Sequence, residues 1–395
     1  MSEPENLDPY HAFVASMRAA WSQEERPLQA HLDVTYRCDL NCKHCYLDNR
    51  TSWPEMTTNE WLNVLDQLHQ AGVMFLTWSG GDVFMRRDFG TLLDRASELG
   101  LMSRVKTHGA HITDEWAQRM VKDKVGRVDV SVYSLNPEIH DRLTQVAGSQ
   151  AATLRGIAAA RRAGLRVKVS FYVQPETIGE IAALYAHFSA LGCRVSFNTN
   201  TVLDHSATEN LVHLRLGDDD LVRARAEILR VEPQELPKRL DELPRHAPCA
   251  AGRTDLYIGP DGEVWPCISF PMALGNLRER PLLDIWRTSP ARQALVAWDN
   301  NDRTTCHSCE GSRFCFFCPG DAYKATGDFR KAAPSFHATS RARMRAWEIV
   351  HGPTFTDDAW ASVPDESGRA PATKRFVFPI HRAKRSEGKR VTGGK

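Results

Sequence analysis

The stretch "HLDVTYRCDLNCKHC", residues 31 to 45, joins a β-rich run to three cysteines that fall within eight positions. The run at its start predicts a strand over 31–35, and the cysteines follow where that strand ends. A structural zinc site and a complete iron–sulfur cluster both need four ligands. Three thiolates therefore leave two possibilities. Either another part of the chain supplies the fourth ligand, or one coordination position stays open.

The totals of the chain describe an ordinary globular protein. At 395 residues it is long for one core, which predicts two domains plus tails. The net charge of +1 gives no overall attraction to nucleic acid or to anionic lipid. The N-terminus "MSEPENLDPYHAF" has no signal-peptide core, and apolar runs such as "VMFLTW" are too short to cross a bilayer. We expect a cytoplasmic protein without membrane or nucleic-acid partners.

Short β-rich runs alternate with helical stretches between about residues 30 and 200. In "TTNEWLNVLDQLHQAG" (57–72), apolar residues recur at helical spacing, and Gly72 is placed to end the helix. The alternation predicts an α/β fold with a parallel sheet, either open and curved or closed as a barrel. Its catalytic groups should gather at the C-terminal strand ends. The expected strands are 31–35, 73–78, 103–108, 127–133, 166–173 and 194–198.

The ten cysteines are unevenly distributed. Three lie between 38 and 45, six lie between 249 and 318, and Cys193 stands alone. In a large chain without a secretion signal, this pattern favours metal ligands over disulfides. Cys193, at the start of a predicted strand, is most simply a buried structural thiol.

Cys38, Cys42 and Cys45 form a Cx3Cx2C motif. One loop with this spacing can hold three irons of a [4Fe–4S] cluster and leave the fourth iron open, the alternative being a zinc site completed by His44 or by a distant residue. With its βα pattern, the chain resembles the radical S-adenosylmethionine (radical SAM) superfamily. The resemblance implies a partial (βα)6 TIM-like barrel and SAM bound to the open iron. It also implies reductive cleavage of SAM to a 5′-deoxyadenosyl radical that abstracts a substrate hydrogen.

"SGGDV" (79–83) stands where the family has a Gly-Gly-Glu-Pro motif that binds the amine of SAM. The resemblance gives this role to Gly80, Gly81 and Asp82. Glycines let the backbone approach a ligand, and an acid can accept a hydrogen bond from an ammonium group. The chain departs from the family in having Asp82 for Glu and Val83 for Pro.

Three further positions resemble SAM-contacting residues of the family. His44 stands where an aromatic side chain usually lies near the adenine, and an imidazole can also stack there. His108, in "KTHGA" (106–110), replaces the Asn of a Thr-Asn-Gly turn, and Ser131, in "VSVYSLNPEIHDRL" (130–143), would face the ribose. For His108 and Ser131 the alternative is an ordinary polar residue at a strand end.

The C-terminal cysteines resemble the SPASM extension of radical SAM enzymes, and together with the barrel motifs the resemblance covers about residues 30–345. The pattern comprises Cys249, then Gly262 with four residues between it and Cys267, and "CHSCEGSRFCFFC" (306–318). SPASM domains usually hold two auxiliary [4Fe–4S] clusters. Read residue by residue, the resemblance assigns Cys249, Cys267 and Cys318 to the first cluster. It assigns Cys306, Cys309 and Cys315 to the second.

Two departures concern this second array. "CFFC" has two residues between its cysteines where the family commonly has three, and the final family cysteine is missing. His337, in "PSFHATSRAR" (334–343), stands near its expected position and is proposed as the fourth ligand, with Asp321 as the rival. Alternatively, the second cluster is three-ligated, degenerate or absent. A zinc site formed by the four cysteines between 306 and 318 is also open.

The expected domains are an N-terminal segment (1–29), the barrel (30–231), a proline-containing linker (232–248), the SPASM domain (249–345) and a basic tail (346–395). Between Arg369 and Lys395 the tail carries nine Lys or Arg against one Glu. This favours a solvated tail over an arm for nucleic acid or an acidic partner. "RFVFPI" (375–380) is apolar enough to dock on the domains.

The family resemblance also suggests a function. SPASM enzymes mostly crosslink or oxidise peptides, and auxiliary clusters suit net oxidation. We therefore expect an oxidoreductase that modifies a ribosomally synthesised peptide, with flavodoxin or ferredoxin as electron donor. The short N-terminus suggests a separate leader-recognition protein. The alternatives are a tetrapyrrole (haem-pathway) or other small-molecule maturase, and a non-catalytic iron–sulfur or zinc scaffold.

Overall fold

The structure is a computed structural model in which nine strands form one sheet. It describes residues 9–47, 54–199, 214–242, 249–299, 302 and 304–363. The strand order is β6-β5-β4-β3-β2-β1-β7-β8-β9, and the first seven of these strands are parallel to one another, whereas β8 and β9 are each antiparallel to the strand before them. The strands are β1 (Gln29–Thr35), β2 (Phe75–Gly80), β3 (Met102–Thr107), β4 (Arg127–Val132), β5 (Val167–Tyr172), β6 (Arg194–Asn198), β7 (Asp255–Ile258), β8 (Glu263–Trp265) and β9 (Gly275–Asn276).

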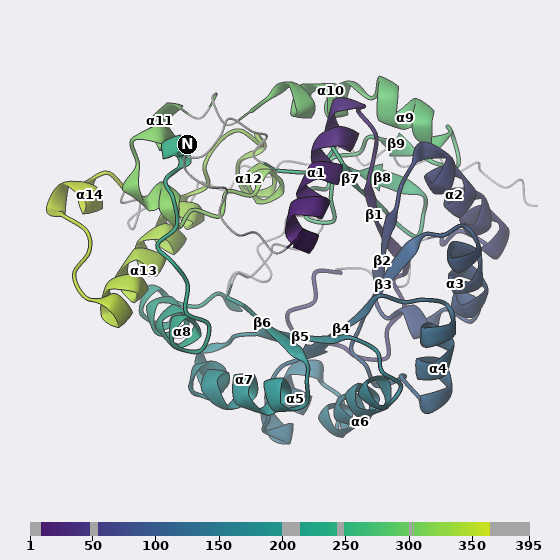
Figure 1. Ribbon diagram of the computed structural model, residues 1–395, viewed down its shortest axis with the longest axis horizontal. Coiled ribbons are helices and arrows are strands. Elements are labelled where there is room, and N and C mark those ends of the chain that lie inside the picture. Colours follow the sequence, from purple (N-terminus) through teal and green to yellow (C-terminus); the bar gives the residue numbers. More distant parts are fainter. Residues whose placement is uncertain are drawn as a thin grey trace, which may run out of the picture.

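Each of the six strands expected from the sequence is present, with ends that differ by at most two residues. The sheet curves into an arc with helices along its outer side (Figure 1). This confirms the α/β partial barrel. The covering helices are α2 (Thr58–Ala71), α3 (Phe89–Glu98), α4 (Asp114–Lys122), α5 (Pro137–Thr144), α6 (Ser149–Arg162) and α7 (Ile181–Ala190).

Helix α2 shows how the sequence sets these helices. The Thr57 hydroxyl accepts a hydrogen bond from the Glu60 backbone amide, and the Glu60 carboxylate accepts one from the Thr57 amide, which forms a capping box. Such a cap contributes about 1 kcal/mol. At the other end, Gly72 adopts a left-handed conformation (φ 86°) and ends the helix as expected.

The two faces of the sheet differ in polarity. In β3, Ser103, Val105 and Thr107 are buried against the helices, whereas Arg104 and Lys106 lie on the opposite, concave face. Alternation of side chains along a strand produces this division. The apolar core therefore lies between sheet and helices, and the concave face is polar. We refer to the side of the sheet that faces away from these helices as the lumen.

The C-terminal part closes the arc. Strand β7 pairs in parallel with β1, so the predicted SPASM domain extends the barrel sheet directly. Helix α8 (Asp218–Val231) follows β6 and packs along α13 (Pro334–His351) on the side that the barrel strands leave open (Figure 1). The other C-terminal helices are α9 (Leu282–Thr288), α10 (Pro290–Ala297), α11 (Thr304–His307), α12 (Pro319–Thr326) and α14 (Asp357–Ala361).

The structure shows helices in or across both of the predicted terminal segments. Helix α1 (Pro9–Gln23) lies in the N-terminal segment, where Arg18 pairs with Asp255 at 3.2 Å and the Trp21 indole donates to the Gly72 carbonyl. Helix α13 runs across residue 346, so the boundary predicted there falls inside a helix. The segment 375–380 lies outside the described residues. In the part of the chain that the structure describes, no helix is long and apolar enough to span a membrane.

Candidate active site

The three-cysteine loop follows β1 and is clamped at both sides. Cys38, Cys42 and Cys45 are partly exposed, and none of the three lies in a disulfide. The Asn41 and Lys43 amides donate to carbonyls at the end of α5, each at 3.0 Å. These bonds fix the loop at the C-terminal ends of the strands, where parallel sheets place catalytic groups.

On its other side the loop meets the Gly-Gly motif. The Gly81 amide donates to the Thr35 carbonyl at 2.8 Å, and the Asp82 amide donates to the Arg37 carbonyl at 2.9 Å. A Cβ atom on Gly80 would lie 2.0 Å from the Thr35 oxygen, and one on Gly81 would lie 2.3 Å from the Arg37 oxygen. Both positions thus require glycine, because the backbone of the cysteine loop itself comes this close.

Asp82 is fully buried behind the loop. One carboxylate oxygen accepts from the Phe84 amide at 3.0 Å. The other accepts from the Thr107 hydroxyl at 2.5 Å and from the His108 amide at 3.1 Å. These bonds tie the ends of β2 and β3 together. A contact of Asp82 or the glycines with the SAM amine stays a prediction.

His108 places a positive charge beside Cys38. Its Nε2 lies 2.9 Å from Asp39 and 3.2 Å from Asp82. Burial by itself lowers the pKa of His108, but the neighbouring carboxylates and the Cys38 thiolate outweigh burial and raise it to about 10. His108 is therefore an imidazolium at neutral pH. A cation beside one of three thiolates fits a negatively charged iron–sulfur cluster.

The zinc alternative at this loop has less geometric support. Among the described residues, the compact group of metal-ligating atoms contains Cys38, Asp39 and His108, all within 4.8 Å of one another. Neither Cys42 nor Cys45 belongs to it, nor does His44, the proposed zinc ligand. The three cysteines of the loop are therefore not gathered around one tetrahedral centre.

His44 lies in an aromatic cluster above the barrel. Its ring stacks on Tyr172 at 4.8 Å between centroids and meets Tyr133 edge-on at 4.7 Å. Both tyrosines lie at the C-terminal ends of strands, β5 and β4. Ser131 lies on β4, paired with Ser170 of β5. This arrangement orients the imidazole, while its stacking on adenine and the contact of Ser131 with ribose stay predictions.

A polar network in the lumen has no counterpart in the sequence-based expectations. Asp33 is fully buried and accepts hydrogen bonds from Tyr257 at 3.0 Å and from Tyr46 at 3.4 Å. His31 Nε2 lies 3.3 Å from the other Asp33 oxygen, and the Tyr36 and Tyr257 hydroxyls are 2.8 Å apart. The available signal was the polar alternation of "HLDVT". Only the parallel pairing of β7 with β1 brings Tyr257 to it.

Cys249, Cys267 and Cys318 lie near one another. Burial raises the pKa of Cys267 to about 11, with the Cys249 thiolate contributing. Burial also raises the pKa of Cys318, as do the Asp321 carboxylate and the thiolates of Cys267 and Cys249. Mutual electrostatic effects of this kind require proximity. The structure thus brings together residues about 70 positions apart in the sequence.

Cys306, Cys309 and Cys315 form the second group. Burial raises the pKa of Cys309, and the thiolates of Cys306 and Cys315 add to the effect. Cys318 is three residues from Cys315, yet the thiolates that raise its pKa, Cys267 and Cys249, belong to the first group. This division favours two separate sites over one zinc site built from the four cysteines between 306 and 318.

The two candidates for the missing ligand occupy different places. The Asp321 amide donates to the Cys318 sulfur at 3.4 Å, and its carboxylate pairs with Lys324 at 3.0 Å, which puts Asp321 beside the first group. His337 lies in the first turn of α13. The same helix reaches the second group through Arg343. Ligation by His337 stays a prediction.

Two arginines near the second group form no ion pair with a carboxylate among the residues that the structure describes. Arg343 donates to the Phe314 carbonyl at 2.7 Å, next to Cys315, and Arg225 of α8 lies near Arg343. Neither guanidinium forms an ion pair with any residue that the structure describes, and each has a buried Nε without a hydrogen-bond acceptor. Burial and the charge of Arg343 lower the pKa of Arg225 to about 9. Two unpaired cations fit a site that holds an anionic cluster.

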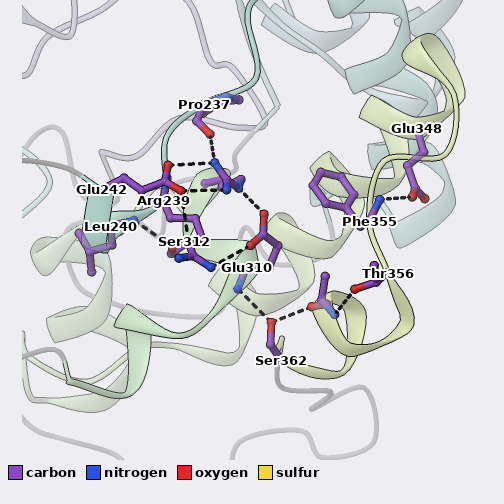
Figure 2. A network of polar contacts seen from close by, with 12 residues as sticks. Pro237, Arg239, Leu240, Glu242, Glu310, Ser312, Glu348, Phe355, Thr356 and Ser362 are labelled. Carbon is purple, nitrogen blue, oxygen red and sulfur yellow. Dashed lines mark hydrogen bonds and ion pairs between the residues drawn. The ribbon is translucent and has the colours of Figure 1, made fainter. Parts of the chain in front are cut away.

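The loop from 306 to 318 is anchored by segments from both directions (Figure 2). The Leu240 amide donates to the Ser312 hydroxyl at 3.1 Å, and Arg239 pairs with Glu310 at 3.5 Å. On the C-terminal side, the Glu310 amide donates to the Ser362 hydroxyl at 2.9 Å. The predicted linker and the segment after α13 therefore hold this loop in place.

Comparison with known proteins agrees with this architecture. A sequence model of the radical SAM superfamily matches residues 32–188, and a model of the SPASM iron–sulfur cluster-binding domain matches residues 249–310. An AdoMet-dependent heme synthase of Methanosarcina barkeri is 26% identical, over 76% of this chain and 94% of the relative. The PqqA peptide cyclase of Granulibacter bethesdensis is 22% identical, over 87% of this chain and 97% of the relative.

The solved structures support the fold. Streptococcus suis SuiB, in a structure bound to precursor peptide SuiA, superimposes with a TM-score of 0.60 at 18% identity. The superposition covers 84% of this chain and 83% of SuiB. Two family models, full-length relatives and the arrangement of the cysteines lead to one assignment. The chain belongs to the radical SAM superfamily and, within it, to the enzymes that carry a SPASM iron–sulfur domain.

Proposed function

We propose that this enzyme abstracts a hydrogen atom from a ribosomally synthesised peptide and oxidatively modifies that peptide, by crosslinking or a similar reaction. The observation that carries the proposal is that groups next to both cysteine regions interact at the concave face of the sheet. Tyr46, next to Cys45, donates to Asp33, and the charge of Lys106 acts on both Asp33 and Cys267. A substrate in the lumen would lie between the site of hydrogen abstraction and an electron acceptor.

As a radical SAM/SPASM enzyme, the chain uses SAM, a [4Fe–4S] cluster and one or two auxiliary iron–sulfur clusters. The family assignment rules out the alternative of a non-catalytic iron–sulfur or zinc scaffold. When bound, SAM and the reduced cluster supply the 5′-deoxyadenosyl radical. We assign Cys38, Cys42 and Cys45 to that cluster, and His108 to balancing its charge.

The chain's own residues supply the surroundings of the substrate. Cys249, Cys267 and Cys318 are the proposed ligands of the auxiliary cluster that faces the lumen. Asp33, held by two tyrosines, is a carboxylate within the lumen that can take up a proton. Water is restricted there, because Asp33 is fully buried.

Two similar proteins that act on or bind peptides favour a peptide substrate over a small molecule. One relative is a peptide cyclase, and SuiB has been solved with its precursor peptide. We also propose a separate leader-recognition protein and a flavodoxin or ferredoxin as electron donor. The second candidate function is tetrapyrrole maturation, because another relative is a heme synthase.

The proposal can be tested with anaerobically reconstituted, dithionite-reduced protein. 5′-Deoxyadenosine is followed by mass spectrometry with each candidate substrate, and the substrate is analysed for a loss of two hydrogens. Short peptides encoded beside the gene form one arm, and an iron porphyrin with propionate side chains forms the other. A variant with all three loop cysteines changed to alanine is the control. Substrate-dependent product from the peptide arm supports the proposal, whereas product from the porphyrin arm alone overturns it.

A further inference from the structure

The concave face of the sheet carries a row of charged side chains. Lys106 of β3 pairs in register with Asp129 of β4, Asp129 with Lys168 of β5, and Lys168 with Arg194 of β6. In each of these strands the flanking valines face the helices. The row therefore contains three cations and one anion, all directed to the lumen.

The single anion of this row is already occupied. Asp129 forms two hydrogen bonds with Arg127, at 2.6 Å and 3.2 Å, and lies 3.8 Å from Arg104. Lys106 and Lys168 form no hydrogen bond or ion pair with any side chain in the described ranges. The two ammonium groups are thus available to an incoming anion.

Lys106 interacts with charged groups of both the barrel and the C-terminal domain. Its charge acts on Asp33 and His31 of β1 and on Cys267. Burial lowers the pKa of Lys106, because the lumen solvates its charge poorly. In such surroundings an anionic partner stabilises an ammonium group more than it does in water.

The next row of the same face supplies hydrogen-bond donors. Ser131 of β4 pairs with Ser170 of β5, and Ser170 with Ser196 of β6. All three are only partly buried, and they lie nearer the cysteine loop than the charged row does. A group that is both anionic and a hydrogen-bond acceptor would meet complementary partners in both rows.

We propose that Lys106, supported by Lys168, binds a carboxylate of the substrate inside the barrel. The inference rests on the proposed function, because it takes the lumen to be the substrate site. The carboxylate belongs either to an acidic side chain of a peptide or to a propionate of a tetrapyrrole. The shared chemistry is a carboxylate buried against an ammonium group.

The test compares acids with their neutral counterparts on the cluster-loaded, SAM-bound enzyme. One pair is a twelve-residue peptide with a single central glutamate and the same peptide with glutamine. The other pair is an iron porphyrin with propionate side chains and its methyl ester. We expect one acid to bind roughly ten- to a hundredfold more tightly than its neutral form, which is the range for a hydrogen bond to a charged group. The pair that shows this preference identifies the source of the carboxylate.

Variants then assign the preference to Lys106. Lys106→Met should abolish it, Lys106→Arg should retain part of it, and Lys122→Met, on the exposed surface of α4, should leave it unchanged. Acetylation of individual lysines by limiting acetic anhydride gives a second readout on the wild-type enzyme. The preferred acid should protect Lys106 but not Lys122.

The outcomes separate this inference from the proposed function. No preference for either acid, or a preference that survives in Lys106→Met, overturns the inference. An acid that binds without protecting Lys106 also overturns it. Absence of 5′-deoxyadenosine from the wild-type enzyme with every substrate would instead contradict the proposed function.

Discussion

The two cysteine regions are built in different ways. The loop from Cys38 to Cys45 takes its three thiols from eight consecutive residues, and strand ends clamp it through backbone hydrogen bonds. The C-terminal region draws on residues from 249 to 318 and divides them between two groups, with Cys318 on the far side of that division from Cys315. Local spacing thus specifies the first site, whereas the second depends on how distant segments pack.

The largest effect should come from the local site. We expect Cys42→Ala to abolish formation of 5′-deoxyadenosine, because one lost thiolate leaves the cluster with two ligands. The measurement is 5′-deoxyadenosine release by reduced enzyme with SAM. Cys193→Ala, in the barrel core, is the matched control and should retain activity. Full activity in Cys42→Ala would show that the loop does not hold the reactive cluster.

The next largest effect should come from a methyl group added at Gly81, where the backbone of the cysteine loop approaches closely. In Gly81→Ala the new Cβ would meet backbone oxygens of Tyr36 and Arg37, at 2.6 Å and 2.3 Å, which cannot move without displacing the loop. We expect a loss of about 2 kcal/mol or more in stability, together with lower iron content. Gly179→Ala has no atom within 4 Å of the new Cβ and serves as control. Equal thermal unfolding and equal iron content in the two variants would contradict the clamp.

The arginine near Cys315 tests whether positive charge balances the second auxiliary cluster of the C-terminal region. Replacing Arg343 by Met removes a positive charge near Cys315, so the reduction potential of the second auxiliary cluster should fall by roughly 50 to 100 mV. The measurement is a redox titration followed by electron paramagnetic resonance, in protein that lacks the three loop cysteines. Arg345→Met, on the exposed side of the same helix, should leave the potential unchanged. An unchanged reduction potential in both variants would show that Arg343 does not balance the charge of this cluster.

The smallest expected effect is a dependence of the stability of the barrel on pH. His140 is buried on α5, and burial lowers its pKa to about 4. The unfolded chain therefore binds this proton first, so stability from the neutral imidazole is complete above about pH 6.5 and is lost as the pH falls towards 4. We expect roughly 1 kcal/mol less stability at pH 5.5 than at pH 7 from this group.

Thermal unfolding measured between pH 7 and pH 5.5 gives this loss of stability. His140→Gln should flatten the dependence, whereas His187→Gln, on an exposed position of α7, should not. Equal slopes in the two variants would mean that another group sets the acid sensitivity of the barrel.

Much of the barrel could be predicted because its signals are local. Strand runs and the helix end at Gly72 depend on only a few neighbouring residues, and the structure has each of them at or next to the expected position. The Gly-Gly motif was also recognisable. Its geometric reason was not, because the close contact is with residues 45 positions earlier in the chain.

Other features could not be read from the sequence. The pairing of β7 with β1 brings Tyr257 to Asp33 across 224 residues. The unpaired arginines come from α8 and α13, and each alone resembles an ordinary surface residue of an amphipathic helix. No periodicity marks which cation will lack a partner, because that depends on what the opposite helix presents.

The sequence by itself determined the chemistry and the scaffold of this enzyme. The spacing of Cys38, Cys42 and Cys45, the Gly-Gly motif and the βα alternation are properties of short segments, and short segments fix ligand geometry and strand periodicity. The family resemblance already divided the six C-terminal cysteines into two groups, but the tertiary structure alone decided which charges face the lumen and which arginines lie near the second group. Those outcomes depend on burial and on contacts between distant residues, and both arise only when the barrel closes against the C-terminal domain.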